Sequence, residues 1–85
     1  MSFFVYMILT KHKGKKISYV GYTKNLYKRL SEHNSSKGAK FTKGKIWDLI
    51  YHKEYKLKSI AMKEEYILKK NIKLRNEIKK KYLKR

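Results

Sequence analysis

The sequence predicts an α+β domain, in which a three-stranded antiparallel sheet is flanked by two or three helices. Three apolar, aromatic-rich runs, at 3–9, 17–22 and 47–55, have the length and composition of β-strands. A polar, glycine-containing segment separates the first two runs, as in a β-hairpin. Stretches with helical spacing of apolar residues precede and follow the third run.

The first two strands are expected to form the hairpin. Phe3–Leu9 is apolar almost throughout, which predicts a central strand that is covered on both faces. Thr10–Lys16 is polar and contains a glycine, so it is predicted to be the connection. Ile17–Tyr22 then returns as the second strand.

The position of the turn decides which residues of the hairpin face each other. A turn folded about His12 and Lys13 would place Tyr6 opposite Tyr19, with both rings on the same face of the sheet. A slip of one residue would move the two rings to opposite faces. The pairing of the two tyrosines is therefore predicted from the turn.

A helical pattern follows the second strand. Thr23–His33 is predicted to be the first helix, because Leu26 and Leu30 lie one turn apart and form an apolar stripe. Thr23 or Asn25 is a suitable N-cap, since a short side-chain oxygen can accept a hydrogen bond from a free backbone N–H of the first turn. A strand, a glycine and a helix are thus expected in direct succession.

The second half of the chain is predicted to contain a loop, a strand and two helices. Asn34–Lys45 contains two glycines and four lysines and is predicted to be a loop. Trp47–Tyr55 is rich in aromatic residues and is predicted to be the third strand. Ser59 is expected to cap a second helix over Ile60–Lys70, and a third helix is expected over Ile72–Arg85.

Size and composition indicate one small domain. The 85 residues lie near the lower limit for a self-sufficient core, and 41% of them are hydrophobic, which argues against disorder. We expect residues 1–70 to form the domain, with residues 71–85 as a basic C-terminal helix or tail that is part of it. With 0 cysteines, thiolate metal sites are excluded, which fits a cytoplasmic setting, or a nuclear one in a eukaryote or virus. Neither a membrane span nor a signal peptide is predicted.

The charge of the chain points to a polyanionic partner. The net charge is +18, from 24 Lys and Arg against 6 Asp and Glu, and such an excess favours binding to nucleic acid. An anionic membrane surface is the competing partner, but it requires a basic amphipathic helix with bulky apolar anchors. A lysine-rich composition can also reflect the base composition of a genome. We expect nucleic acid and no membrane.

Several short motifs occur together in the chain, namely Phe4-Val5-Tyr6, Tyr19-Val20-Gly21, Arg29, His33 and Glu65. Their combination resembles a known family, the GIY-YIG nuclease domain. The stretch Lys37-Gly38-Ala39-Lys40-Phe41-Thr42 is similar to one found in the small stand-alone, UPF0213-like branch of this family. The first motif here has Phe-Val-Tyr in place of Gly-Ile-Tyr, which keeps the tyrosine.

The resemblance implies a metal-dependent endonuclease that hydrolyses DNA phosphodiester bonds. In such an enzyme Glu65 would hold a divalent metal, with Mg²⁺ as the expected ion. Tyr6 would act as general base for water, and Tyr19 would help to position water or phosphate. Arg29 would stabilise the charge of the transition state through its planar fork, and His33 would assist by relaying a proton.

Each of these side chains also has an ordinary structural explanation. Glu65 lies in or beside the apolar stripe of its helix, where it could pair with one of many lysines. Its neighbour Glu64 leaves open a shift of one residue in the assignment. Arg29 could be a surface residue, and His33 could compensate the dipole at the helix C-terminus.

Lysines of the loop and the tail are predicted to contact phosphates. These residues are Lys37, Lys40, Lys43, Lys45 and Lys73. Phe41 in the same loop could stack on a base, and Gly21 could allow the backbone to approach a ligand closely. A solvated basic loop and ordinary turn geometry are the alternatives.

Three functional classes therefore remain for the chain. The first is the endonuclease, with DNA favoured over RNA as its substrate. The second is a non-catalytic nucleic-acid-binding module or subunit, which would need a protein partner for activity or specificity. The third is a small basic protein of a ribonucleoprotein. Such a protein would not need the candidate catalytic residues Tyr6, Tyr19, Arg29, His33 and Glu65.

Overall fold

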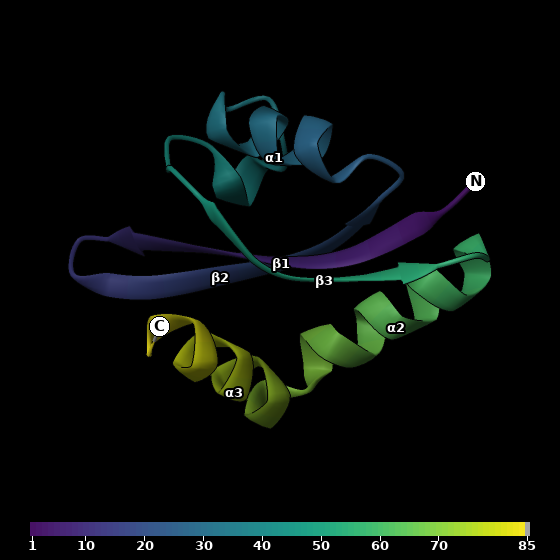
Figure 1. Ribbon diagram of the computed structural model, residues 1–85. Helices are drawn as coiled ribbons and strands as arrows, with labels where there is room; N and C mark the ends of the chain where they lie inside the picture. Colours follow the sequence, from purple (N-terminus) through teal and green to yellow (C-terminus); the bar gives the residue numbers. More distant parts are fainter. Residues whose placement is uncertain (85) are drawn as a thin grey trace.

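The structure of the protein is a computed structural model that describes residues 1–84. Figure 1 shows three layers, with the sheet in the middle, one helix on one face and two helices on the other. The sheet consists of β1 (Phe3–His12), β2 (Lys15–Thr23) and β3 (Asp48–Tyr55), and the helices are α1 (Leu26–Asn34), α2 (Lys58–Lys70) and α3 (Ile72–Leu83). The predicted α+β class is confirmed.

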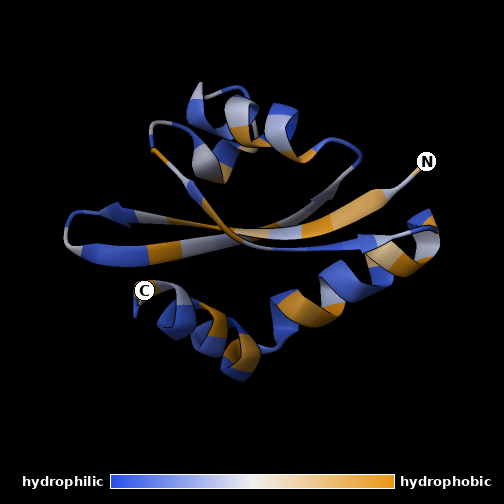
Figure 2. Ribbon diagram, in the orientation of Figure 1, coloured by the Kyte–Doolittle hydropathy of each residue, from blue (hydrophilic) through white to orange (hydrophobic). Residues whose placement is uncertain are grey.

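The central strand of the sheet is β1, as its apolar sequence predicted. The strand order is β2-β1-β3, and both pairings are antiparallel. Side chains from Val5 to Leu9 are all buried, because alternate residues point to opposite faces and both faces are covered. Figure 2 shows hydrophobic residues along the middle of β1 and hydrophilic ones at the hairpin end of β1 and β2.

The hairpin turn lies one residue later than predicted. Lys13 and Gly14 form a two-residue turn between His12 and Lys15, and both turn residues have positive φ, 52° and 78°. Two successive positive φ values are typical of a type I′ turn, whose twist matches that of the strands it joins. Glycine adopts this backbone without strain, so Gly14 sets the position of the turn.

The shifted turn changes the predicted pairing of the two tyrosines. Tyr6 pairs with Gly21, and Tyr19 pairs with Ile8, so the predicted opposition of Tyr6 and Tyr19 is wrong. Moving the turn by one residue shifts the pairing by two, which keeps each side chain on its face. Both tyrosine rings therefore still lie on the same face of the sheet, as the sequence predicted, and this face is covered by α1.

Two apolar clusters hold the layers together. Under α2 and α3 the buried residues are Val5, Met7, Val20, Ala61 and Leu68. Under α1 they are Tyr6, Ile8 and Trp47, against which Leu26 and Leu30 pack. Each face of β1 is thus buried by a different set of helices.

The first and second helices begin at other residues than predicted. Helix α1 begins at Leu26 rather than Thr23, because the side chain of Asn25 accepts a hydrogen bond from the backbone N–H of Lys28 at 3.1 Å. Helix α2 begins at Lys58, so Ser59 lies inside the helix and is no cap. The residue before α2 makes no side-chain capping bond.

The third helix and third strand also differ slightly from the expectation. Asn71 caps α3 by accepting a hydrogen bond from the backbone N–H of Leu74 at 3.0 Å. Helix α3 ends at Leu83, and Arg85 lies outside the described residues. Strand β3 begins after Trp47, whose side chain is buried under α1 instead. Within residues 1–84, no helix is both long enough and apolar enough to cross a membrane.

The cluster under α2 and α3 is testable through its methionine. Met7 has 0% exposure, so we expect Met7→Ala to lower the free energy of unfolding by about 2–5 kcal/mol through lost contacts and a residual cavity. Met62 is 47% exposed, and Met62→Ala should cost less than about 1 kcal/mol. Urea unfolding followed by circular dichroism measures both values. Equal losses would contradict the described core.

Candidate active site

Tyr6 reaches from the central strand to the free edge of the sheet. Its side chain is buried, and its ring lies over Gly21 of the edge strand β2. A Cβ atom at Gly21 would stand 2.5 Å from the phenolic oxygen, so only glycine leaves room for the ring. The close approach that we expected Gly21 to offer a ligand is therefore taken up by Tyr6.

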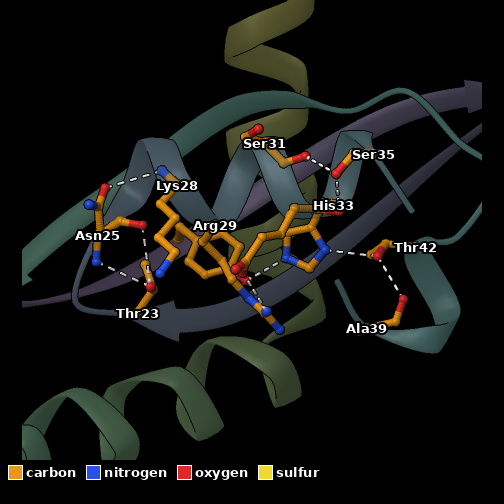
Figure 3. Close-up of polar contacts among 11 residues, drawn as sticks. Thr23, Asn25, Lys28, Arg29, Ser31, His33, Ser35, Ala39 and Thr42 are labelled. Atoms are coloured by element: carbon orange, nitrogen blue, oxygen red, sulfur yellow. Dashed lines mark hydrogen bonds and ion pairs between the residues drawn. The ribbon is translucent and has the colours of Figure 1, made fainter. Parts of the chain in front are cut away.

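His33 joins three parts of the chain through two hydrogen bonds. Its ring has 0% exposure. Nε2 lies 2.7 Å from the hydroxyl oxygen of Tyr6, and Nδ1 lies 2.8 Å from Oγ1 of Thr42. Figure 3 shows the imidazole at the end of α1, with Thr42 approaching from the loop. A short 3-10 helix, η1 (Lys40–Thr42), places the threonine there.

The hydrogen bonds of Thr42 define the tautomer of His33. The threonine hydroxyl has a single proton, which it donates to the carbonyl of Ala39 at 2.8 Å. Oγ1 must therefore accept from Nδ1–H of the imidazole. In a neutral ring Nε2 then has no proton, so it accepts one from the hydroxyl of Tyr6. The result is a directed chain from Tyr6 through His33 to Thr42.

Sequence reasoning did not identify Thr42. Gly38, four residues before Thr42, leaves the space that the ring of His33 occupies, because a Cβ atom at Gly38 would collide with Nδ1 of the ring. The stretch Lys37–Thr42 carries the resemblance to the UPF0213-like branch, and its lysines are predicted to contact phosphates, but neither observation gives Thr42 a role of its own. Gly38 and Thr42 can be read from the sequence, but only the folded loop places them against the ring of His33.

Burial keeps both Tyr6 and His33 neutral at neutral pH. Burial raises the pKa of Tyr6 to about 12, Arg29 opposes this rise, and Tyr19 and Glu65 add to it. Burial also lowers the pKa of His33, and the positive charge of Arg29 lowers it further, against the pull of Glu32. The pair thus meets as a phenol and an uncharged imidazole.

Arg29 lies on the same side of α1 as His33, as the four-residue spacing predicted. Its guanidinium forms an ion pair with Glu32 at 3.0 Å and stays about one-third exposed. It is close enough to Tyr6 to be among the main causes acting on that pKa. Arg29 also lines an open hollow of about 440 Å³ together with Lys24 and Lys28.

Tyr19 is held between two other rings. It meets His33 edge-on with ring centroids 5.3 Å apart, and it stacks on Phe41 at 6.1 Å with the planes 21° apart. Phe41 is 53% exposed, and its ring also lies 6.3 Å from the ring of Trp47 and has Nζ of Lys45 5.4 Å from its centroid. In this structure the stacking partner of Phe41 is Tyr19, and stacking of Phe41 on a base stays a prediction.

The two neighbouring glutamates point to different parts of the sheet. Glu65 forms an ion pair with Lys69 at 3.4 Å, and its side chain is 18% exposed. Its charge is one of those that raise the pKa of Tyr6, so it lies on the side of the site. Glu64 faces β3, where burial and then Glu64 raise the pKa of Tyr55. Of the two, Glu65 is the one whose charge acts on the pKa of Tyr6.

A metal ion at Glu65 would depend on more than protein ligands. Among the described residues, no three His, Asp or Glu side chains gather in a way that could hold a metal. Mg²⁺ is commonly bound by one or two carboxylates, with water and substrate phosphates completing its shell. The single carboxylate of Glu65 fits this mode of binding and does not fit an all-protein cage.

The five lysines expected to contact phosphates do not form one patch. Four of them, Lys37, Lys40, Lys43 and Lys45, lie in the loop on the α1 side, while Lys73 lies on α3 on the other side of the sheet. Lys45 is engaged already, because its Nζ donates to the carbonyl of Phe41 at 3.1 Å. Contacts of all five with phosphates stay a prediction.

Comparison with known proteins adds a family match. A family model described as the GIY-YIG catalytic domain matches residues 2–82. A UPF0213 protein of Oceanobacillus iheyensis is 48% identical over 52 residues, which is 60% of either chain. A UPF0213 protein of Bacillus subtilis is 41% identical over 61 residues, 71% of this chain and 62% of its own. The chain thus spans less than two thirds of the length of these two relatives.

Two further similarities cover more of the chain. A UPF0213 protein of Staphylococcus haemolyticus is 40% identical over 65 residues, 75% of this chain and 78% of its own. The solution NMR structure of a UPF0213 protein from Bacillus halodurans is 35% identical, covers 91% of this chain and 80% of that one, and gives a TM-score of 0.48. The names of these relatives state no activity.

The lowered pKa of His33 predicts a pH dependence of stability. Below about pH 6.5 the unfolded chain binds a proton at this residue, which the folded protein with its lower pKa does not bind. The free energy of unfolding should therefore fall as the pH drops from about 6.5 until the folded imidazole is protonated. Urea unfolding of the parent between about pH 5 and 7 measures this fall.

Two variants assign the effect to its residue. His33→Gln should flatten the pH dependence, whatever its own stability. His52→Gln removes an exposed imidazole and should retain the slope of the parent. If the slope survives in His33→Gln, the buried imidazole is not its source.

Proposed function

Because the chain belongs to the GIY-YIG catalytic domain family, we propose that it is a metal-dependent endonuclease that hydrolyses DNA phosphodiester bonds. The observation that carries the proposal is the buried hydrogen bond of 2.7 Å between Tyr6 and His33, with the Arg29 cation beside it. A base, a proton acceptor and a permanent cation are what attack of water on a phosphodiester requires.

In the proposed reaction Tyr6 is the general base for the attacking water. Its oxygen accepts a proton from water while its own proton passes to Nε2 of His33. The new bond forms between the water oxygen and phosphorus, the bond from phosphorus to the leaving oxygen breaks, and the leaving oxygen takes up a proton from solvent. A pKa of about 12 makes a free phenolate unfavourable at neutral pH, and the relay removes the need for one.

Arg29 and Tyr19 act on the phosphate. The guanidinium of Arg29 stabilises the negative charge that develops on the phosphoryl oxygens, and its ion pair with Glu32 at 3.0 Å holds the fork in place. Tyr19, fixed between His33 and Phe41, orients the water or the phosphate.

Glu65 is the proposed ligand for a divalent metal, with Mg²⁺ as the expected ion. When bound, such an ion acts as a Lewis acid and stabilises charge on the phosphate and the leaving oxygen. The ion pair of Glu65 with Lys69 involves a lysine that is 47% exposed, and pairs of this kind are weak. The carboxylate can therefore exchange the lysine for a metal ion at small cost.

Nucleic acid is the proposed substrate, with DNA favoured over RNA. A net charge of +18 and the exposed lysines of the loop suit a phosphate backbone. Contacts to phosphates carry little sequence information, so we propose that a protein partner supplies specificity. The lysines would then provide affinity for nucleic acid, and the protein partner would determine where the nucleic acid is cut.

The deciding experiment is a cleavage assay with Mg²⁺ on single-stranded, duplex and branched DNA. We expect cutting by the parent that is lost on chelation. Glu65→Gln should abolish cutting but leave DNA affinity equal or slightly higher, because a negative charge is removed near a polyanion. Glu64→Gln is the matched control and should cut as the parent does.

The Lys69 ion pair also supports a second candidate, a nucleic-acid-binding module without catalysis. In that case Glu65 would serve only to pair with the lysine. Binding of DNA by the parent, with no metal-dependent cutting of any form, would favour this candidate and contradict the endonuclease.

Arg29→Lys separates charge from geometry. Lysine keeps the positive charge but lacks the planar fork, so turnover should drop by ~10²-fold while DNA affinity changes little. Single-turnover rates and equilibrium binding measure the two effects. An unchanged rate would remove Arg29 from the chemistry, and unfolding of the variant is checked by circular dichroism.

A further inference from the structure

A hollow beside Tyr19 is not used by the proposed chemistry. It has a volume of about 200 Å³ and lies between the β2 segment Ser18–Val20 and the side chains of Lys69 and Arg75. These two cations come from the end of α2 and the start of α3. Because β2 is an edge strand, the hollow lies at the free edge of the sheet.

The charged side chains in the described lining of this hollow are both cationic. Among residues 1–84, Nε of Arg75 is buried without a hydrogen-bond partner. A buried donor without an acceptor is costly, and a guanidinium presents five N–H donors in a fixed plane. Lys69 is 47% exposed and pairs with Glu65 only at 3.4 Å, so it can turn toward another anion.

We propose that this hollow binds a backbone phosphate of the nucleic acid next to the one that is cleaved. The inference rests on the proposed function, since it assigns a second contact to the same substrate. The guanidinium of Arg75 donates two hydrogen bonds to the phosphate oxygens, one of them from Nε. Lys69 adds a point charge to the same phosphate.

The position of the hollow along β2 supports a neighbouring phosphate. The hollow around Arg29 includes Tyr22, whereas the hollow around Arg75 includes Tyr19. Three residues of a strand span about 10 Å, a distance of the order of one or two nucleotides of an extended strand. A single strand that follows the edge of β2 therefore meets Arg29 near Tyr22 and Arg75 near Tyr19.

Nitrogen NMR of the arginine side chains tests this contact in the unmodified protein. The chain has only three arginines, Arg29, Arg75 and Arg85, so single Arg→Lys variants assign each Nε–H signal. The probe is a single-stranded oligodeoxynucleotide of about eight nucleotides, added without metal so that no cleavage occurs. We expect the Arg75 signal to shift and its exchange with water to slow.

The Arg29 signal separates failure of this inference from failure of the proposed function. A shift of Arg29 without a shift of Arg75 would overturn the second phosphate site and leave the nuclease proposal intact. A shift of Arg75 in a protein that never cuts DNA would support the site and contradict the nuclease. If neither signal responds, the second phosphate site is wrong, and the cleavage assay decides the nuclease proposal by itself.

Binding constants give an independent readout. Arg75→Gln should weaken binding of the same oligonucleotide roughly tenfold and reduce the slope of log K against log salt by about 0.7, the value for one lost phosphate contact with a single strand. Lys80→Gln removes the same charge from an exposed position on α3 and should change affinity less than about twofold. Equal effects of the two variants would show that only net charge matters and would overturn the site.

Discussion

The buried imidazole of His33 is the constraint on which the rest of the site depends. A ring with 0% exposure must find a partner for each nitrogen, since an unsatisfied buried polar atom costs about 1–3 kcal/mol. The partners are Tyr6 on β1 and Thr42 in the loop. The loop is held by a second set of bonds, because Asn34 accepts from the backbone N–H of Trp47 at 2.6 Å and Trp47 donates to the carbonyl of Thr42 at 3.0 Å. Helix, loop and sheet thus support the same ring.

Space for this arrangement comes from two residues without side chains. Gly21 leaves room for the ring of Tyr6 above the edge strand, and Gly38 leaves room for the ring of His33. The side chain of Tyr6 can therefore extend from the fully covered central strand to the free edge of the sheet. Protein around both rings lowers the local dielectric, which explains why burial shifts their pKa values toward the neutral forms.

The sheet edge also joins two kinds of chemistry that lie in different layers. The α1 layer supplies the proton relay and the cation of Arg29. The layer of α2 and α3 supplies the carboxylate of Glu65 and the cationic hollow of Lys69 and Arg75. A substrate strand along β2 would contact both layers at once, which a flat face of the sheet, covered by helices on either side, does not allow.

Local patterns in the sequence determined the architecture, the central position of β1, the common face of Tyr6 and Tyr19, and the alignment of Arg29 with His33. Most of these features depend on periods of two residues in a strand and about four in a helix, and the common face of the two tyrosines depends also on the predicted turn. The tertiary structure alone decided which residue pairs with Tyr6, and it alone brought Thr42 to His33. The first depended on a turn shifted by one residue, and the second on a hydrogen bond between residues nine positions apart in the sequence. Such contacts follow from the path of the chain and the space left by small residues, and no local period encodes either.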